Sequence, residues 1–392
     1  MLKIFGAMGD GEHDDTPSFL QALSVATKLY IPEGTYRITK EIEIPKGMII
    51  SGAGEVSILK IESEIGIITT SANTVIKDLK IVGNDENTAL KLFKNKQIVK
   101  NVIFEHFKVG CINKNSDYIG TVKFVDLSFD YVKTCFESNT LTNGVSFNRI
   151  VAYRFDCILK AYWIEGNGFN NCFFEIGNEG SVIVDVPEGK SNCRAMSLSF
   201  NSCYIENVTQ LLSKVVAGVV KFDNCWLYTK KSFYDNPTGA NSLKLLFSNC
   251  SFSVPNGVGN KGIIFNLSSY HTITIINPYG LVNGVGAFDL KAGVNIVGGI
   301  VNLDNKSMKQ TKVTATTNTN GAIKTGLLTT KHRLLCTYGY VKDGSSNVLM
   351  IPYMSGDNWY VVCKNPGSDA LLSEKEIEVR MVYTDKTNIE EV

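Results

Sequence analysis

The sequence predicts an all-β protein: a right-handed parallel β-helix with an N-terminal capping helix and a small C-terminal β-sandwich domain. Three observations support this fold class. A short apolar motif recurs every 22–31 residues, an amphipathic segment precedes it, and short apolar runs between turn residues follow it. The composition, with 34 Gly, 20 Phe and 16 Tyr among 392 residues, favours short strands and turns over helices.

Residues 1–45 are expected to cap the β-helix, because an open stack of coils exposes its apolar core at both ends. In DDTPSFLQALSVATK, Asp15 or Thr16 can cap a helix that has Pro17 in its first turn. The apolar residues of this segment recur at helical spacing and would face the first coil: Phe19, Leu20, Leu23 and Ala26.

Residues 46–307 are expected to form the β-helix. The repeating unit is Φ-x-Φ-x-[Asn/Asp]-Φ-x-Φ, where Φ is apolar or Cys, with weaker copies around Ile50, Ile275 and Ile296. This spacing is too short for a β-propeller blade, and the Leu/Asn signature of leucine-rich repeats is missing. The third position of the clear copies is Ile76, Val99, Phe124, Phe147, Phe169, Phe200, Phe222 and Phe247.

Stacking such units about 4.8 Å apart places like residues over like residues and makes one continuous core. The position after the polar corner would then form an inward column of small apolar residues, which explains several of the ten cysteines as reduced core residues. The corner itself is often Asn, which tolerates the left-handed conformation of a turn. The inward column is Leu79, Val102, Leu127, Ile150, Cys172, Cys203, Cys225 and Cys250, and the corner asparagines are Asn101, Asn171, Asn224 and Asn249.

Residues 308–392 are expected to form a separate β domain. The repeat ends after Val301, and the polar, Thr/Asn-rich stretch that follows suits a linker, which places a boundary near residue 308. Beyond it, GLLTTKHRLLCTYGYV, SNVLMIPYMS, NWYVVCKN and KEIEVRMVYT read as strands between turns, typical of a compact antiparallel sandwich.

Two segments carry a family resemblance: FGAMGDGEHDDTPSFLQAL and LYIPEGTYRITKEIEIPKGMIISGAG. They resemble the opening of pectate-lyase-superfamily β-helices, especially phage tailspikes and capsule depolymerases, and the coil spacing continues the likeness to about residue 300. The resemblance implies a homotrimer in the virion that acts on bacterial surface polysaccharide and contacts another phage tail protein. It also implies a trimerisation or glycan-contact role for residues 308–392.

The charge balance gives no sign of a nucleic-acid or membrane partner. Lys and Arg total 39 against 38 Asp and Glu, so the net charge is +1, and no apolar run approaches the length of a membrane span. The cysteines and histidines show no metal-binding spacing, so neither a metal nor another cofactor is expected.

Strand alternation predicts two outward columns beside the inward ones. They place exposed aromatic residues beside acidic ones on successive coils, as a sugar-binding surface requires, because sugar rings stack on aromatic side chains. The first column is Ile103, Ser128, Val151, Phe173, Tyr204, Trp226 and Ser251, and its neighbour is Glu105, Asp130, Tyr153, Glu175, Glu206, Tyr228 and Ser253.

Glu175 and Glu206 are therefore the candidate catalytic pair, and Tyr153, Phe173, Tyr204, Trp226 and Tyr228 the candidate substrate-binding residues. Glycosidic cleavage needs one carboxyl group to protonate the leaving oxygen and another as base or nucleophile. One-coil separation suits the retaining mechanism, but hydrolases of the resembled family often invert, and the stereochemistry stays open. The leading hypothesis is therefore an endo-glycosidase that cuts bacterial surface polysaccharide. The alternative functions are a polysaccharide lyase that uses Tyr153 with Arg154, or Lys160, and a non-catalytic glycan-binding adhesin. The exposed aromatics could also belong to a trimer interface.

Overall fold

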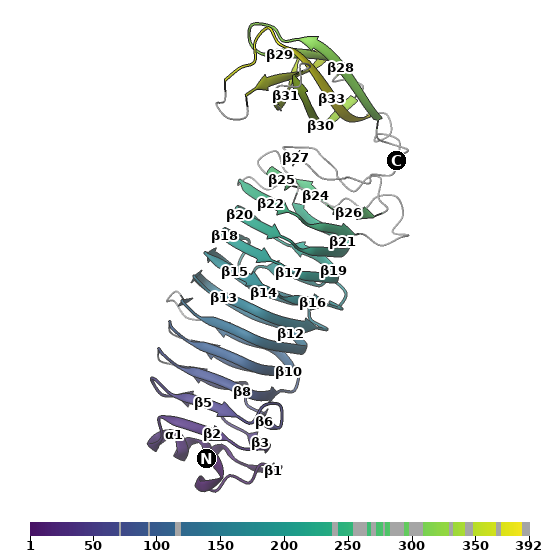
Figure 1. The fold of residues 1–392 in the computed structure, drawn as a ribbon. Coiled ribbons are helices and arrows are strands. Elements are labelled where there is room, and N and C mark those ends of the chain that lie inside the picture. The colour runs from purple at the N-terminus through teal and green to yellow at the C-terminus, as the bar shows by residue number, and fades with distance from the viewer. Residues whose placement is uncertain are drawn as a thin grey trace. The chain divides into compact units, whose positions relative to one another are not determined.

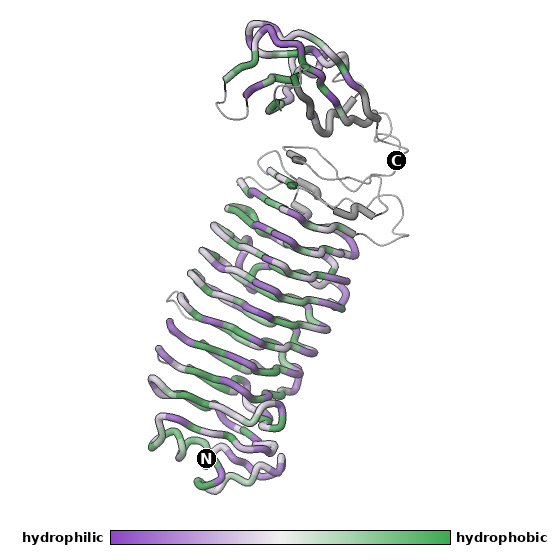
Figure 2. Tube along the Cα trace, in the orientation of Figure 1, coloured by the Kyte–Doolittle hydropathy of each residue, from purple (hydrophilic) through white to green (hydrophobic). Residues whose placement is uncertain are grey.

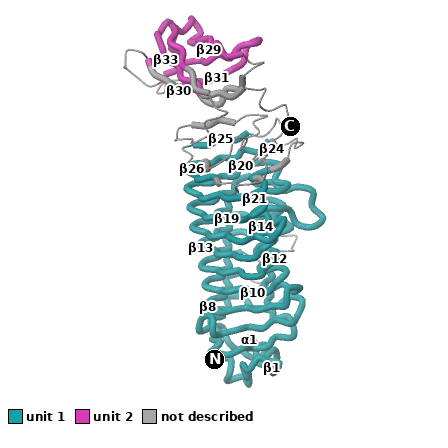
Figure 3. The backbone as a smooth tube through the Cα atoms, turned by 90° about the vertical axis from the view of Figure 1, so that its right-hand side faces the viewer, with its two compact units in different colours: residues 1–280, 286–294 teal, residues 281–285, 295–392 magenta. Residues whose placement is uncertain are grey.

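The computed structural model describes residues 1–69, 72–92, 95–113, 119–236, 242–253, 265–267, 272–276, 279–282, 294–297, 309–328, 332–341, 348–365 and 370–385. The chain divides into two compact units (Figure 3). The first comprises residues 1–280 and 286–294, and the second comprises residues 281–285 and 295–392. The boundary expected near residue 308 lies outside the described residues.

The first unit is a parallel β-helix, in which each strand pairs with the equivalent strand of the next coil (Figure 1). The elements up to residue 297 are η1 (Leu2–Phe5), β1 (Asp10–Asp14), α1 (Thr16–Val25), β2 (Lys28–Ile31), β3 (Gly34–Ile38), β4 (Ile42–Ile44), β5 (Ile49–Gly52), β6 (Ser57–Ile61), β7 (Ile65–Thr69), β8 (Val75–Val82), β9 (Thr88–Leu92), β10 (Ile98–Asn113), β11 (Ile119–Gly120), β12 (Lys123–Asn143), β13 (Ser146–Tyr153), β14 (Cys157–Glu165), β15 (Asn167–Asn170), β16 (Phe173–Glu175), β17 (Val182–Asp185), β18 (Cys193–Asn201), β19 (Tyr204–Leu212), β20 (Val215–Asp223), β21 (Trp226–Asn236), β22 (Leu243–Ser248), β23 (Ser251–Ser253), β24 (Phe265–Leu267), β25 (Thr272–Ile276), β26 (Tyr279–Val282) and β27 (Val294–Val297).

The predicted register of the repeat is confirmed. The third motif position of each coil pairs with that of the next, from Ile50 through Phe247 to Ile275. From Phe124 to Phe247 these side chains form a stack of phenyl rings, with neighbouring centroids 4.1–5.3 Å apart and planes within 9° of each other. Hydrophobic and hydrophilic residues alternate along the coils, as a one-sided core requires (Figure 2).

The inward column and the corners also match the prediction. Cys172, Cys203, Cys225 and Cys250 are buried, and the nine cysteines whose side chains are described are all free. The four corner asparagines have φ between 50° and 52°. Asn adopts this left-handed conformation more readily than most residues, because its short polar side chain can bond the local backbone. The corner residue therefore turns the chain from one sheet of the coil into the next.

The predicted capping helix is α1, at the N-terminal end of the stack (Figure 1). Asp15 occupies the N-cap position, but its buried carboxylate accepts hydrogen bonds from the backbone N–H groups of Met8 (2.7 Å) and Gly9 (3.2 Å), not from the helix. The buried stripe contains Phe19, Ala22 and Leu23. The expectation that Leu20 faces the coil is wrong, because one residue after Phe19 lies about 100° round the helix, and Leu20 is 43% exposed.

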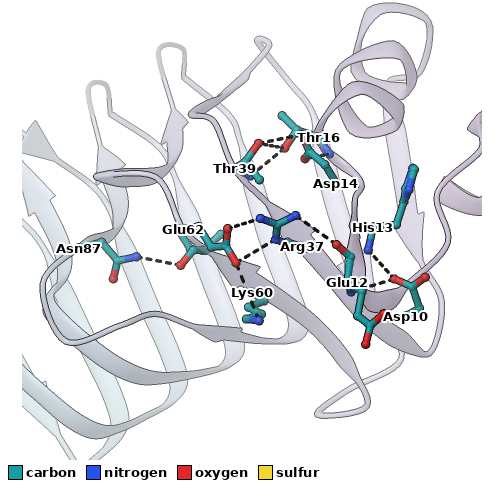
Figure 4. A network of polar contacts seen from close by, with 11 residues as sticks. Asp10, Glu12, His13, Asp14, Thr16, Arg37, Thr39, Lys60, Glu62 and Asn87 are labelled. Atoms are coloured by element: carbon teal, nitrogen blue, oxygen red, sulfur yellow. Dashed lines mark hydrogen bonds and ion pairs between the residues drawn. The ribbon is translucent and has the colours of Figure 1, made fainter.

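Polar contacts join the cap to the first coils (Figure 4). Arg37 binds Glu62 with Nε–Oε1 2.9 Å, and it donates a second hydrogen bond to the carbonyl of Glu12 (3.1 Å). The Arg37 hydrogen bond lowers the pKa of Glu62. Burial alone would raise the pKa of Asp14, but hydrogen bonds from Thr16 and Thr39 outweigh it and lower that pKa. These ionised carboxylates tie β1, β3 and the chain after β6 together.

The second unit contains two antiparallel sheets of three strands, in the orders β28-β33-β30 and β29-β32-β31. Both sheets supply buried residues to one hydrophobic cluster, as expected of a β-sandwich: Ile323, Leu327, Val361 and Cys363 from one sheet, and Val341, Ile377, Val379 and Met381 from the other. The strands are β28 (Lys309–Thr316), β29 (Ala322–Leu328), β30 (His332–Val341), β31 (Leu349–Ser355), β32 (Asn358–Lys364) and β33 (Glu376–Asp385).

Candidate functional site

An aromatic column runs along one face of the β-helix, on strands β16, β19 and β21. Phe173 pairs with Tyr204, and Tyr204 pairs with Trp226, as the predicted register requires. The Phe173 and Tyr204 rings stack with centroids 4.7 Å apart and planes 6° apart. The Tyr204 and Trp226 rings follow at 6.1 Å and 8°. Three successive coils thus present one parallel stack of aromatic rings.

These rings point outward because their immediate neighbours point inward. Phe174, Ile205 and Leu227 follow the three aromatics in sequence and are fully buried. Successive side chains of a strand point to opposite faces, so the aromatic side chains face solvent. Phe173 and Tyr204 are partly exposed, and Trp226 is 43% exposed. Because neighbouring rings stack face to face, the column offers a ligand mainly the edges of its rings and the outer faces at its two ends.

The two candidate catalytic carboxylates lie on adjacent coils beside this column. Glu175 pairs directly with Glu206, and both are partly exposed. The Tyr204 hydroxyl donates a hydrogen bond to Oε2 of Glu206. That bond, together with partial burial and the charges of Glu206 and Glu175, raises the pKa of Tyr204 to about 12. Tyr204 therefore remains a protonated donor at neutral pH.

The environments of the two carboxylates differ. Glu206 accepts the Tyr204 hydrogen bond, whereas Glu175 has no hydrogen bond or ion pair with any other described residue. The Tyr204 hydroxyl can therefore hold the Glu206 carboxylate in one orientation, whereas the Glu175 carboxyl group has no such donor among the described residues. The pair thus offers two carboxyl groups in different surroundings, and glycosidic cleavage needs two carboxyl groups with different tasks.

Tyr153 and Tyr228 flank the carboxylates on the neighbouring coils. Tyr153 pairs with Glu175, and its ring centroid lies 6.0 Å from that of Phe173, with planes 59° apart. Tyr228 does not align with Glu206 alone, as the regular column predicted. The register shifts by one residue between Ile205 and Val208, so that Glu206 and Asn207 together face Tyr228.

The basic residues considered for lyase chemistry lie in other surroundings. Arg154 forms an ion pair with Asp130, and its guanidinium carbon lies 4.1 Å from the Tyr131 ring centroid. Lys160 lies on β14, in a different sheet of the coil from Tyr153, and aligns with Glu137 and Asp185 on the adjacent coils. Neither cation lies in the register of the Glu175–Glu206 pair.

Sequence reasoning missed two features near this face. One is the bond between Tyr204 and Glu206, although their spacing of two already placed them on the same face. The other is a corner stack in which the His106 and Tyr131 rings lie 5.0 Å apart and Arg154 covers Tyr131. All three residues have positive φ, which short motifs do not reveal for His, Tyr and Arg.

Within the described parts of the chain, no group of three or more His, Cys, Asp or Glu side chains is arranged to hold a metal ion. The described helices include none that is both long and apolar enough to cross a membrane.

Comparisons with known proteins place this geometry in a family. Residues 2–241 match the family model described as rhamnogalacturonase A/epimerase, pectate lyase-like. The pre-neck appendage protein of Bacillus phage B103 is 40% identical over 53 residues, which are 14% of this chain and 6% of that protein. Alginate lyase 7 of Azotobacter vinelandii is 34% identical over 110 residues, which are 22% of this chain and 13% of that protein. The chain thus spans only a small part of either relative.

Among solved structures, the endo-xylogalacturonan hydrolase of Aspergillus tubingensis has a TM-score of 0.50 at 13% identity, over 75% of this chain and 90% of the hydrolase. That likeness supports the β-helical fold. The family match spans more than half of the chain and includes the coils that carry Glu175, Glu206 and the aromatic column. The chain therefore belongs to the rhamnogalacturonase A/epimerase, pectate lyase-like family, a family of polysaccharide-acting enzymes.

Proposed function

We propose that this chain is a phage tailspike depolymerase, an endo-glycosidase that cleaves bacterial capsular or O-antigen polysaccharide. The observation that carries the proposal is the pairing of Glu175 with Glu206 beside the stacked rings of Phe173, Tyr204 and Trp226. Sugar rings would lie against the ring edges along the aromatic column and stack on the free faces at its ends, which would bring a glycosidic bond to the two carboxylates.

In this mechanism Glu206 is the base or nucleophile and Glu175 is the general acid. Tyr204 would have two roles, because its ring is part of the platform while its hydroxyl orients Glu206. Strand spacing of about 4.8 Å is close to the roughly 5–5.5 Å separation of carboxyl groups in retaining enzymes. The adjacent-coil arrangement therefore favours retention of stereochemistry.

The proposed setting is the virion, with the protein acting at the bacterial surface. The match to the pre-neck appendage protein of a Bacillus phage supports a place in the phage tail. By the same reasoning we propose a homotrimer that attaches to another tail protein, with residues 308–392 serving trimerisation or glycan contact.

A lyase acting on a uronate-containing polysaccharide is the second candidate, supported by the partial match to alginate lyase 7. Lyase chemistry needs a base to remove a proton and a cation to stabilise the adjacent carboxylate. Tyr153 could be the base, but Arg154 beside it is already paired with Asp130. The geometry therefore favours the hydrolase.

A product assay tests the proposal. The protein is incubated with capsule or O-antigen from candidate hosts, and reducing ends and near-ultraviolet absorbance are followed. A Glu175→Gln, Glu206→Gln double variant is the test, and Glu105→Gln, an outward Glu that is paired with Lys80, is the matched control. New reducing ends without absorbance, lost only in the double variant, support the hydrolase. New absorbance identifies a lyase, and binding without either product identifies an adhesin.

A further inference from the structure

Arg194 differs from the other arginines of the first unit. It is exposed, and its side chain makes no hydrogen bond or ion pair with any other described residue. Its guanidinium carbon instead lies 5.6 Å from the centroid of the Trp163 ring. The other three arginines each bind a carboxylate: Arg37 with Glu62, Arg149 with Asp126, and Arg154 with Asp130.

A second cation lies over Tyr162, the residue before Trp163 on β14. The ammonium of Lys190 is 4.5 Å from the centroid of the Tyr162 ring, and within the described residues it has no acidic partner. Lys190 belongs to the segment between β17 and β18, in the coil that takes 31 residues from Phe169 to Phe200, whereas the other coils from Ile76 to Phe247 take 22–25. The extra residues bring Lys190 back over the preceding coil.

Hydrogen bonds through Glu165 hold the Trp163 ring in place. Its indole N–H donates to Oε1 of Glu165 (3.1 Å), and Oε2 of Glu165 accepts a hydrogen bond from Asn143 (3.4 Å). The Glu165 carboxylate is therefore engaged by neutral donors and is not paired with Arg194. This arrangement fixes the indole and leaves the charge of Arg194 without a counter-ion among the described residues.

Apolar side chains are exposed next to Arg194. The register between β18 and β20 shifts after Ala195, and Met196 and Val219 are 48% and 38% exposed at this point. Gly218 permits the close approach of the two strands here, since a Cβ on it would lie 1.9 Å from the carbonyl oxygen of Ala195. The register shift thus exposes the side chains of Met196 and Val219, which form an apolar rim beside Arg194.

We propose that Tyr162, Trp163, Lys190 and Arg194 form a second glycan-contact patch, selective for saccharides that carry a carboxylate. A cation over an aromatic ring keeps its N–H donors directed outward, and the guanidinium fork matches a planar carboxylate. Aromatic faces and the Met196–Val219 rim would contact the C–H groups of the sugar ring. The patch lies on β14, on β18 and on the segment between β17 and β18, whereas the aromatic column lies on β16, β19 and β21.

Affinity electrophoresis tests this patch independently of catalysis. The full chain, carrying Glu175→Gln and Glu206→Gln to prevent cleavage, is run through native gels that contain polygalacturonate, alginate, dextran or dextran sulfate. The variants are Arg194→Gln, Lys190→Gln and their combination. Arg149→Gln removes the same charge at an exposed site and is the matched control. Thermal melting checks that each variant is folded.

Each single substitution should raise the apparent Kd for polygalacturonate and for alginate by about tenfold, as the loss of one charge-assisted hydrogen bond implies. Binding to dextran should not change, and Arg149→Gln should behave like the parent. The proposal is overturned if the double variant is retarded as strongly as the parent, or if neither polyuronate retards the parent. An equal loss on dextran sulfate would overturn the assignment to a carboxylate. None of these outcomes depends on whether the protein cleaves glycan.

Discussion

Replacing Phe169 by Ala should strongly destabilise the β-helix. Phe169 is fully buried, its ring stacks on Phe147 at 4.1 Å and on Phe200 at 4.9 Å, and it meets Phe174 edge-on at 5.8 Å. Truncating a buried Phe to Ala typically costs about 3–5 kcal/mol. Stacked coils leave little room to close the cavity, because each coil is held by hydrogen bonds to both neighbours.

The matched control lies four residues further along the same coil. Phe173 is only partly buried, it stacks face to face on Tyr204, and its ring meets that of Tyr153 at a tilt. Phe173→Ala should therefore reduce the free energy of unfolding by about 1–1.5 kcal/mol, in the range of aromatic contacts at a partly exposed position. The two substitutions remove the same atoms, so the difference between them reports only which way the side chain points.

Urea unfolding followed by far-ultraviolet circular dichroism measures both effects. The midpoint of Phe169→Ala should fall at least twice as far as that of Phe173→Ala, with little change in the slope of the transition. Equal shifts, or a larger shift for Phe173→Ala, would mean that the strand register is displaced by one residue. The outward column, and with it the candidate site, would then be refuted.

Three further outcomes are expected. Tyr204→Phe keeps the ring stack but removes the donor to Glu206, so the rate of cleavage should fall by roughly 10- to 100-fold with little change in melting temperature; an unchanged rate would exclude the orienting role. Arg37→Gln should slightly lower the melting temperature at pH 7. Because the pKa of Glu62 is lowered in the folded state, its contribution is present above the unfolded value of about 4.5 and is lost as the pH falls through the folded value. The difference from wild type should therefore shrink at low pH to the part that comes from the Arg37 hydrogen bond to the Glu12 carbonyl, and a difference as large at pH 2 as at pH 7 would contradict this linkage. Burial raises the pKa of Cys193 to about 12, so this thiol should resist a thiol reagent at pH 8 until urea unfolds the chain; fast reaction in the native state would contradict its burial.

Much of the fold was predictable because equivalent positions of the repeat pair on successive coils, so the repeat itself defines the strand register. Most coils repeat the motif at nearly the same length, so aligning Phe124, Phe147 and Phe169 in the sequence also aligned them in space. The corner asparagines followed from the repeat motif, and the outward aromatics followed from strand alternation on either side of the corner. Alternation also holds at Tyr228, which lies between buried Leu227 and Thr229. The regular pairing from coil to coil does not hold there, because the one-residue shift after Ile205 depends on packing that no local pattern encodes.

The features that could not be predicted depend on long-range contacts between side chains. The ion pair of Arg154 with Asp130 joins residues on adjacent coils. The repeat spacing does not show in which direction the long Arg154 side chain extends, so this pair could not be predicted. Lys190 lies over Tyr162 only because the chain between β17 and β18 folds back. Irregular segments of this kind lack the periodicity from which the coils could be predicted.

The most direct test of the account compares single substitutions at the two carboxylates. Once a cleaved polysaccharide is identified, kcat/KM is measured for Glu175→Gln, Glu206→Gln and the control Glu105→Gln. The account predicts losses on the order of 100- to 10,000-fold for each of the first two, with no change in melting temperature, and wild-type activity for the control. Wild-type activity in either Glu175→Gln or Glu206→Gln would show that the catalytic carboxylates lie elsewhere on the chain.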